Sequence, residues 1–370
     1  MSAITNVQRA SILTLTALLG AVGCTDSTSA EEACDAGLVA TDSSWCAPPR
    51  PDIDEDGDGS PASEDCDDTD ASIHPGAEEF CDGIDSDCSG GDDAGLLTLV
   101  DDATGERTNL ASGAGVDLSD DATLAVCAGE HAVAIDTTAT LVVNGLHEDA
   151  VLTGRGSSVP LTVSRGGALD VFDVTIRDGD SRDNAYDSGG GIHCEESDVY
   201  LSGVTIEGGS ATSGGNLSTY ECDVVIENSL LRDGEANGSG GNVLIYGGEL
   251  RLVSSRVEGG DAAYGSAIAV QGGGVLVQED TLIVDARGDS ALNLYDGSWY
   301  CEGKLGLETG IIGSAGAALS FNSGDTFWTD NCDFGEAASH VNETDIIGPY
   351  FDFDDLGNDV ELECDGEGIC

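Results

Sequence analysis

An apolar column that recurs at nearly constant spacing constrains this 370-residue chain more than any other feature. The column contains Ile192, Leu217, Val243, Ile268, Leu292 and Leu319, at spacings of 25, 26, 25, 24 and 27 residues. A second column advances almost in step with the first, at Ile176, Ile206, Leu231, Val257 and Leu282. Because no single repeat of this length buries its apolar face alone, two such columns predict a solenoid of stacked coils. We expect residues 94–348 to form an all-β parallel β-helix, since no stretch has a helical period.

Alternation within each repeat predicts which side chains face the core. Two residues beyond the first column we expect buried side chains, at Cys194, Thr219, Ile245, Val270, Leu294 and Phe321. Three residues beyond it we expect outward-facing side chains, at Glu195, Tyr220, Tyr246, Gln271, Tyr295 and Asn322. The column of Tyr220, Tyr246 and Tyr295 has two interpretations. Tyrosine is common on strand surfaces, and the same column would suit a strip that binds a glycan or protein ligand.

The repeats also resemble a known class of solenoid. The starts Gly189-Gly190-Gly191-Ile192 and Gly240-Gly241-Asn242-Val243, with the half-repeat Val204-Thr205-Ile206, are similar to right-handed β-helix domains of the pectin lyase-like superfamily and of polymorphic outer-membrane proteins. The resemblance implies a right-handed parallel β-helix. It leaves the activity open, because this fold serves lyases, hydrolases, adhesins and spacers.

The catalytic groups of that fold are poorly represented here. A pectate-type lyase needs a basic residue beside a calcium-bound uronate, yet the chain has one lysine, Lys304, and three arginines next to the second column, Arg177, Arg232 and Arg256. The Gly-His-Gly turn of polygalacturonase-like hydrolases is absent from the sequence. The histidines lack ligand or triad spacing, and we expect each at the surface: His74, His131, His147, His193 and His340. A binding or structural module is favoured, and a polysaccharide lyase or glycoside hydrolase is the alternative.

A calcium loop is the clearest chemical motif. Asp54, Asp56 and Asp58 alternate before Gly59, and Asp65 stands at loop position 12. Calcium prefers six to eight oxygen ligands, and carboxylates at positions 1, 3, 5 and 12, with a glycine at 6 for the turn, supply such ligands. Prolines beside the loop argue against the flanking helices of an EF-hand.

The residues that follow extend this motif. Asp65-Cys66-Asp67-Asp68, Ile73-His74-Pro75-Gly76 and Cys81-Asp82-Gly83-Ile84-Asp85-Ser86-Asp87-Cys88 closely resemble the short Asp/Cys metal-binding repeat of secreted bacterial proteins of the MopE type. More distantly they resemble the thrombospondin type 3 repeat. The resemblance implies that residues 51–93 form an irregular segment wound around calcium and stapled by disulfides, with Asp67, Asp82, Asp85 and Asp87 as further ligands. A solvated acidic linker is the alternative.

Charge and cysteine content indicate an exported protein. Lys and Arg number 12 against 71 Asp and Glu, a formal net charge of −59, which excludes nucleic acid as a natural partner. Residues 1–23 have the features of a signal peptide, with Arg9 before an apolar stretch too short to span a membrane. Ala21-Val22-Gly23-Cys24 resembles a bacterial lipoprotein signal, which implies a lipid anchor on Cys24 at the outer membrane or cell surface. Plain signal cleavage is the alternative.

The remaining segments follow from these assignments. Residues 24–50 are polar and rich in small residues, and we interpret them as a tether. Residues 349–370 are interpreted as an acidic C-terminal cap. Thirteen cysteines less a lipidated Cys24 leave twelve, an even number that suits an oxidising compartment.

Overall fold

The computed structural model describes residues 39–40, 46–47, 53–90, 95–182, 187–288, 290–303, 309–312, 317–321, 325–330 and 332. The chain forms two compact units, Met1–Ala71 and Ser72–Cys370. The predicted signal peptide, Cys24 and the predicted C-terminal cap lie outside the described residues. All regular elements that the structure describes are strands. None of the described residues forms a helix with the length and apolarity needed to cross a membrane.

The described part of the first unit contains two short strands and an irregular stretch. Strands β1 (Val39–Ala40) and β2 (Cys46–Ala47) pair antiparallel. Residues 53–71 follow as a succession of turns and bends. Four prolines within or just before this stretch, together with glycines at positive φ, keep it from extending into a strand or helix.

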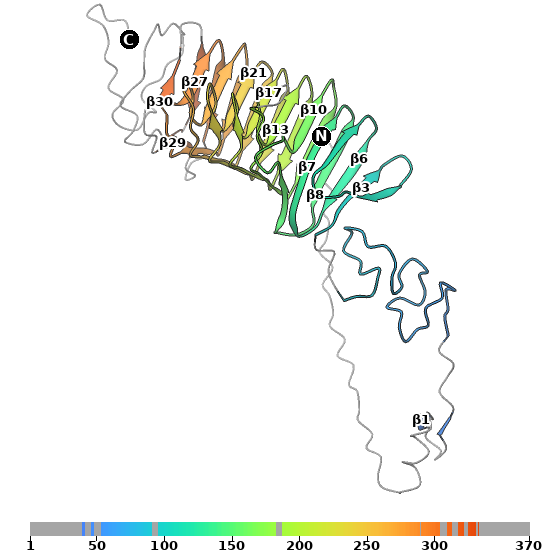
Figure 1. Ribbon diagram of the computed structural model, residues 1–370. Helices are drawn as coiled ribbons and strands as arrows, with labels where there is room; N and C mark the ends of the chain where they lie inside the picture. Colours follow the sequence, from blue (N-terminus) through green and yellow to red (C-terminus); the bar gives the residue numbers. More distant parts are fainter. Residues whose placement is uncertain are drawn as a thin grey trace, which may run out of the picture. The chain divides into compact units, whose positions relative to one another are not determined.

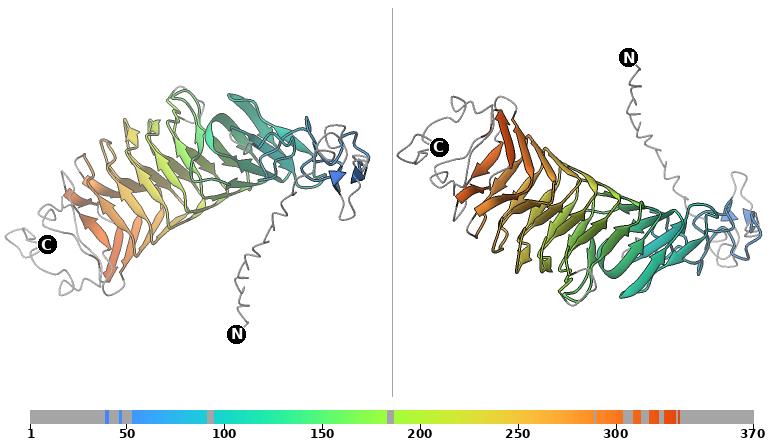
Figure 2. Two further views of the ribbon diagram at one scale, coloured as in Figure 1. Left: turned by 90° about the horizontal axis from the view of Figure 1, so that it is seen from below. Right: turned by 90° about the horizontal axis from the view of Figure 1, so that it is seen from above.

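The second unit is a parallel β-solenoid whose coils have three walls (Figures 1 and 2). The first wall contains β5 (Ala114–Leu118), β7 (Gly129–Thr137), β10 (Leu161–Ser164), β13 (Ile192–Glu195), β17 (Leu217–Tyr220), β21 (Val243–Tyr246), β24 (Ile268–Gln271), β27 (Ser290–Tyr295) and β30 (Ala317–Ser320). The second wall contains β8 (Thr140–Gly145), β11 (Ala168–Phe172), β14 (Asp198–Ser202), β18 (Asp223–Glu227), β22 (Glu249–Val253), β25 (Val275–Glu279), β28 (Ser298–Glu302) and β31 (Thr326–Asp330). The third contains β9 (Ala150–Thr153), β12 (Thr175–Arg177), β15 (Thr205–Glu207), β19 (Leu230–Arg232), β23 (Arg256–Glu258), β26 (Leu282–Val284) and β29 (Gly310–Ile312).

The N-terminal end of the second wall departs from the parallel pattern. Strand β6 (Ala122–Val126) pairs parallel with β8, whereas β3 (Leu97–Asp101) pairs antiparallel with both β6 and β4 (Arg107–Asn109). The β3–β4 hairpin therefore ends this sheet as a cap. A small two-stranded sheet of β16 (Ser210–Ala211) and β20 (Glu235–Ala236) lies in the loops between the third and first walls.

Single residues in the left-handed conformation turn the chain between walls. Between the second and third walls these residues are Asp173, Gly203, Asn228, Ser254 and Asp280. After the third wall they are Asp178, Gly208, Asp233, Gly259 and Asp285, so aspartate and glycine alternate from coil to coil. Glycine adopts this conformation without a steric penalty, and aspartate and asparagine tolerate it better than most residues. The alternation therefore places one glycine coil between successive aspartate coils.

The core confirms the predicted register of the first wall. Cys194, Thr219, Ile245, Val270 and Leu294 pair in series across the coils and are at most 1% exposed, and Phe321 is also buried. The second apolar column is confirmed through Val257, but its last member was wrong: Val257 pairs with the buried Ile283, and Leu282 pairs with Arg256. Leu282, Ile283 and Val284 are all apolar, so alternation alone could not identify the inward side chain.

Two buried asparagines connect neighbouring coils inside the solenoid. Asn216 Nδ2 donates to Asn242 Oδ1 at 2.7 Å, and both residues are fully buried. Their side-chain oxygens also accept from the backbone N–H groups of Gly209 (2.8 Å) and Gly234 (3.0 Å). These bonds satisfy polar groups that would otherwise destabilise the interior.

Candidate metal centre

The first candidate metal centre lies in the calcium-like loop of the first unit. Asp54, Asp56 and Asp58 each direct a carboxylate oxygen to one place, and these oxygens lie within 4.8 Å of one another. The turn is held by Asp54, whose two oxygens accept from the N–H groups of Gly57 (2.6 Å) and Gly59 (3.0 Å). Gly59 has a φ of 106°, a conformation that only glycine adopts readily.

The other carboxylate oxygens of this loop are of two kinds: some accept hydrogen bonds, and some are buried without a donor. One oxygen of Asp56 accepts from the N–H of Asp58 at 3.2 Å, and one of Asp58 accepts from Ser60 at 2.7 Å. The second oxygens of Asp56, Asp58 and Asp65 are buried and have no hydrogen-bond partner. Three buried acceptors without donors are costly unless a cation is bound beside them.

The pKa of Asp56 is raised by burial and by the neighbouring carboxylates. Burial of the Asp56 carboxyl raises its pKa, the N–H of Asp58 opposes this shift, and the charges of Asp58, Asp65 and Asp54 raise the pKa further. Asp65 is therefore close enough to Asp56 to act on it, as loop position 12 predicts. The structure groups the carboxylates of Asp54, Asp56 and Asp58, and Asp65 adds a buried oxygen without a hydrogen-bond partner.

A second acidic group lies in the second unit. Carboxylate oxygens of Glu79, Asp85 and Asp87 lie within 4.8 Å of one another. Asp85 repeats the role of Asp54, because its two oxygens accept from the N–H groups of Ser89 (3.1 Å) and Gly90 (2.9 Å). Gly90 follows Asp85 by five residues, as Gly59 follows Asp54, and in both loops the glycine N–H donates to the aspartate carboxylate. The two loops therefore contain the same kind of turn. Ser89 occupies the place that corresponds to Asp58.

Two predicted ligands lie outside both groups. The Asp82 carboxylate forms an ion pair with Arg107 at 2.6 Å and accepts from the N–H of Ile84. The Asp67 carboxylate accepts from the hydroxyl of Thr69 at 2.7 Å. Glu79 was missed by the sequence analysis, because it precedes Cys81 outside the Asp-x-Asp pattern and reaches the group only through the fold.

The cysteines of the Asp/Cys segment are oxidised. Cys66 in the first unit and Cys88 in the second are each disulfide-bonded. Cys81 is bonded to Cys127, and within the solenoid Cys194 pairs with Cys222 and Cys301 with Cys332. The predicted disulfide stapling is confirmed.

Comparison with known proteins agrees with a metal-binding segment. Residues 65–94 match a protein family, Cu-binding MopE, described as "Putative metal-binding motif". No curated protein and no solved structure matches the chain. The family match covers the Asp/Cys segment and does not extend over the solenoid.

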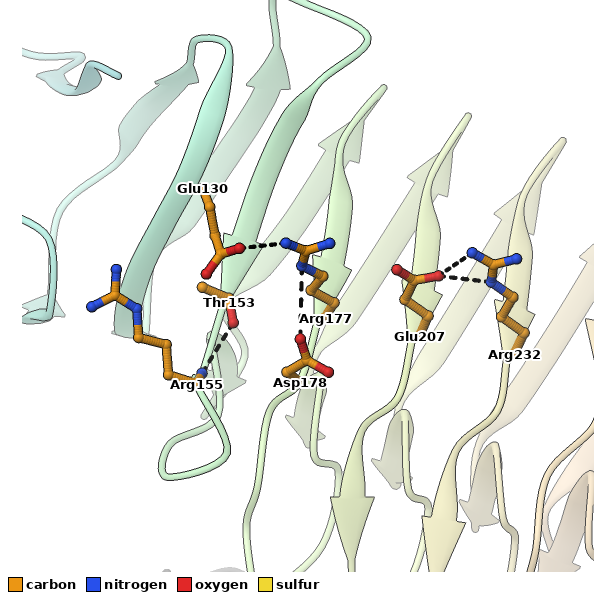
Figure 3. Close-up of polar contacts among 7 residues, drawn as sticks. All are labelled: Glu130, Thr153, Arg155, Arg177, Asp178, Glu207 and Arg232. Carbon is orange, nitrogen blue, oxygen red and sulfur yellow. Dashed lines mark hydrogen bonds and ion pairs between the residues drawn. The ribbon is translucent and has the colours of Figure 1, made fainter. Parts of the chain in front are cut away.

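The three arginines next to the second apolar column, Arg177, Arg232 and Arg256, are ion-paired (Figure 3). Arg177 contacts Glu130 and Arg232 contacts Glu207 on the outer face of the third wall, and the side chains of each pair point toward one another. Arg256 is paired with Glu258 at 3.3 Å. The hydrogen bonds that Arg177 donates to Glu130 and Arg232 donates to Glu207 raise the pKa of both guanidinium groups. A guanidinium held by a carboxylate is unsuited to accept a proton from a substrate.

Two histidines contradict the expectation of a surface position. His131 is 5% exposed and bonds through Nε2 to the carbonyl of Cys127 at 3.0 Å, and His193 is 3% exposed. Nδ1 of His193 lies 2.7 Å from the hydroxyl of Ser218, and burial lowers the pKa of His193 to about 4. His193 points outward from the first wall, but the loop around Ser188 covers it. Strand alternation does not predict such a cover.

The tyrosine column lies in the predicted register. Tyr220 pairs with Tyr246, and Gln271 separates Tyr246 from Tyr295. Tyr220 and Tyr295 are exposed, whereas Tyr246 is half-buried. The rings of Tyr220 and Tyr246 stack at a centroid distance of 4.4 Å. The facing surfaces of these two rings are used in this contact and are not available to a partner.

Proposed function

We propose that this chain is an exported, calcium-binding surface lipoprotein whose β-solenoid serves as a binding or structural module. The observation that carries the proposal is the first loop, where buried oxygens of Asp56, Asp58 and Asp65 lack donors beside Asp54. A divalent cation would neutralise these charges and fill the coordination of each oxygen.

Calcium suits both acidic groups better than a transition metal does. Their side chains offer carboxylate oxygens, which hard cations prefer, whereas copper favours imidazole and thiolate ligands. The cysteines beside these groups, Cys66 and Cys88, are disulfide-bonded and have no thiolate to offer. We assign the first ion to Asp54, Asp56, Asp58 and Asp65, and a second to Asp85 and Asp87 with Glu79.

The solenoid supports a non-catalytic role. Three arginines that a lyase could use as a base are held in ion pairs by Glu130, Glu207 and Glu258. The outer column of Tyr220, Tyr246 and Tyr295 is the candidate surface for a glycan or protein partner. The attachment of Cys24 to a lipid, and with it a location at the outer membrane or cell surface, rests on the sequence of the signal.

Calcium titration of the full chain by calorimetry tests the central claim. We expect heat of calcium binding that Asp56→Ala reduces by at least about tenfold in affinity, because it removes a ligand and leaves the neighbouring carboxylates. Glu55→Ala is the matched control, since its side chain is exposed on the same turn and Glu55 contacts Asp68 only through its N–H. Absence of calcium heat, or copper binding that Asp56→Ala leaves unchanged, would contradict the assignment.

A further inference from the structure

The second acidic group is joined to the N-terminal cap of the solenoid by several independent contacts. The disulfide between Cys81 and Cys127 links the Asp/Cys segment to the residue that follows β6. The N–H of Cys81 donates to Thr98 Oγ1 in β3 at 2.9 Å. Asp82 is paired with Arg107 in β4, and the guanidinium of Arg107 also lies 5.4 Å from the centroid of the Phe80 ring. Residues 80–82 are therefore attached to both strands of the cap.

Glu79 joins this attachment to the acidic group. Its backbone carbonyl accepts from Asn109 Nδ2 in β4 at 2.7 Å, while its carboxylate accepts from the N–H of Asp87. Asn109 Oδ1 in turn accepts from the Thr98 hydroxyl at 2.6 Å. Thr98 is 1% exposed. Glu79 thus contacts the cap through its main-chain carbonyl, and its side chain belongs to the acidic group with Asp85 and Asp87.

We propose that a divalent cation bound by Glu79, Asp85 and Asp87 fastens the Asp/Cys segment onto the β3–β4 cap, so that the stability of the cap depends on the metal. This inference rests on the proposed calcium binding and on the match of residues 65–94 to a metal-binding motif. Without a cation, three carboxylates within 4.8 Å repel one another. Movement of Glu79 away from Asp85 and Asp87 relieves this repulsion. The same movement weakens the hydrogen bond between the Glu79 carbonyl and Asn109.

The proposed cation would stabilise the N-terminal end of the second wall, where the sheet has an exposed edge strand. Strand β3 closes the second wall, and β4 is its edge strand. Edge strands open more readily than central ones and offer unpaired backbone groups to other chains. A cap that is held shut by calcium keeps this edge intact where calcium is abundant, as it is outside the cell.

Hydrogen–deuterium exchange on the full, oxidised chain tests the coupling. With calcium at 100 times its Kd, amides of β3 and β4 should exchange about 100-fold more slowly than with chelator, if cap opening releases the ion. Amides of the central strand β18 should be unchanged. Glu79→Gln should lose the calcium-dependent protection of the cap and one bound ion, and Glu78→Gln, at an exposed neighbour, should keep both.

A second variant separates binding from coupling. Asn109→Ala removes the bond to the Glu79 carbonyl and leaves the three carboxylates in place, so it should keep the calcium stoichiometry and lose much of the protection. Failure of the chain to bind calcium at all would overturn the proposed function together with this inference. Calcium binding with equal exchange of β3 and β4 in calcium and chelator would overturn this inference alone.

Discussion

At the residue scale, burial decides how individual side chains behave. Asp56 and His193 carry opposite charges when ionised, and burial disfavours the charged form of each. A bound cation would stabilise the ionised carboxylate of Asp56, whereas His193 remains neutral beside Ser218. Neither environment follows from residue type, because it depends on which segments fold over the side chain.

His193 makes stability depend on pH. Its pKa is about 4 in the folded chain and about 6.5 when unfolded, so between these values the unfolded state binds a proton that the folded state excludes. The free energy of unfolding should be highest above pH 6.5 and fall by about 3 kcal/mol as pH drops to 4. Urea unfolding of the wild type and His193→Gln at pH 7, 5.5 and 4.5 measures the contribution of His193 to the free energy of unfolding. Parallel pH profiles of the two proteins would show that His193 contributes nothing.

At the element scale, spacing predicts the stacking of strands, while alternation predicts only their local faces. The first column was placed correctly along six coils because small residues precede each of its members and mark the same point of every coil. Leu282 was misplaced because its neighbours are equally apolar. His193 and Glu79 were misjudged because loops and long-range contacts, which no periodicity encodes, set their surroundings.

The first wall gives a paired test of the register. Ile245→Asp buries an unpaired charge between coils and should lower the free energy of unfolding by several kcal/mol, on the order of 4. Tyr295→Ala, at an exposed position in the neighbouring column, should change it by about 0.5 kcal/mol or less. Tyr246→Ala should fall between them, at about 1 kcal/mol, since it loses the stacking with Tyr220. Denaturant unfolding monitored by circular dichroism provides the comparison.

The alternation of aspartate and glycine after the third wall has an electrostatic consequence. An ideal Cβ on Gly208 would lie 3.1 Å from Oδ1 of Asp178, and Asp233 follows on the next coil. Gly208→Asp would place three carboxylates on successive coils and should cost about 1 kcal/mol more than Gly208→Asn, which has the same shape without the charge. The difference should shrink in 1 M salt. Equal stability of the two variants at low salt would argue that the alternation serves conformation alone.

At the scale of the whole molecule, charge and disulfides favour the exported location that we propose. A formal net charge of −59 repels itself, and both bound cations and external salt reduce this repulsion. Within the part of the chain that the structure describes, eight cysteines are disulfide-bonded: Cys66, Cys81, Cys88, Cys127, Cys194, Cys222, Cys301 and Cys332. So many disulfides are typical of an oxidising compartment outside the cytoplasm. Export and extracellular calcium thus suit the same molecule.

The cysteine count leads to a prediction about the anchor. Beyond the eight bonded cysteines the chain has Cys24, Cys34, Cys46, Cys364 and Cys370, an odd number. Modification of Cys24 leaves an even number for disulfides. We expect the chain, expressed with its signal in a lipoprotein-processing bacterium, to incorporate labelled fatty acid and to partition into detergent, since acyl chains add apolar surface that the acidic chain lacks.

Cys24→Ser should abolish both the label and the partitioning while calcium binding stays unchanged, because Cys24 lies far along the chain from the acidic loops. Cys34→Ser is the matched control: it also removes one cysteine but should keep the label. A wild-type mature N-terminus that is unmodified and remains in the aqueous phase would mean plain signal cleavage. The chain would then be released from the membrane instead of anchored to it.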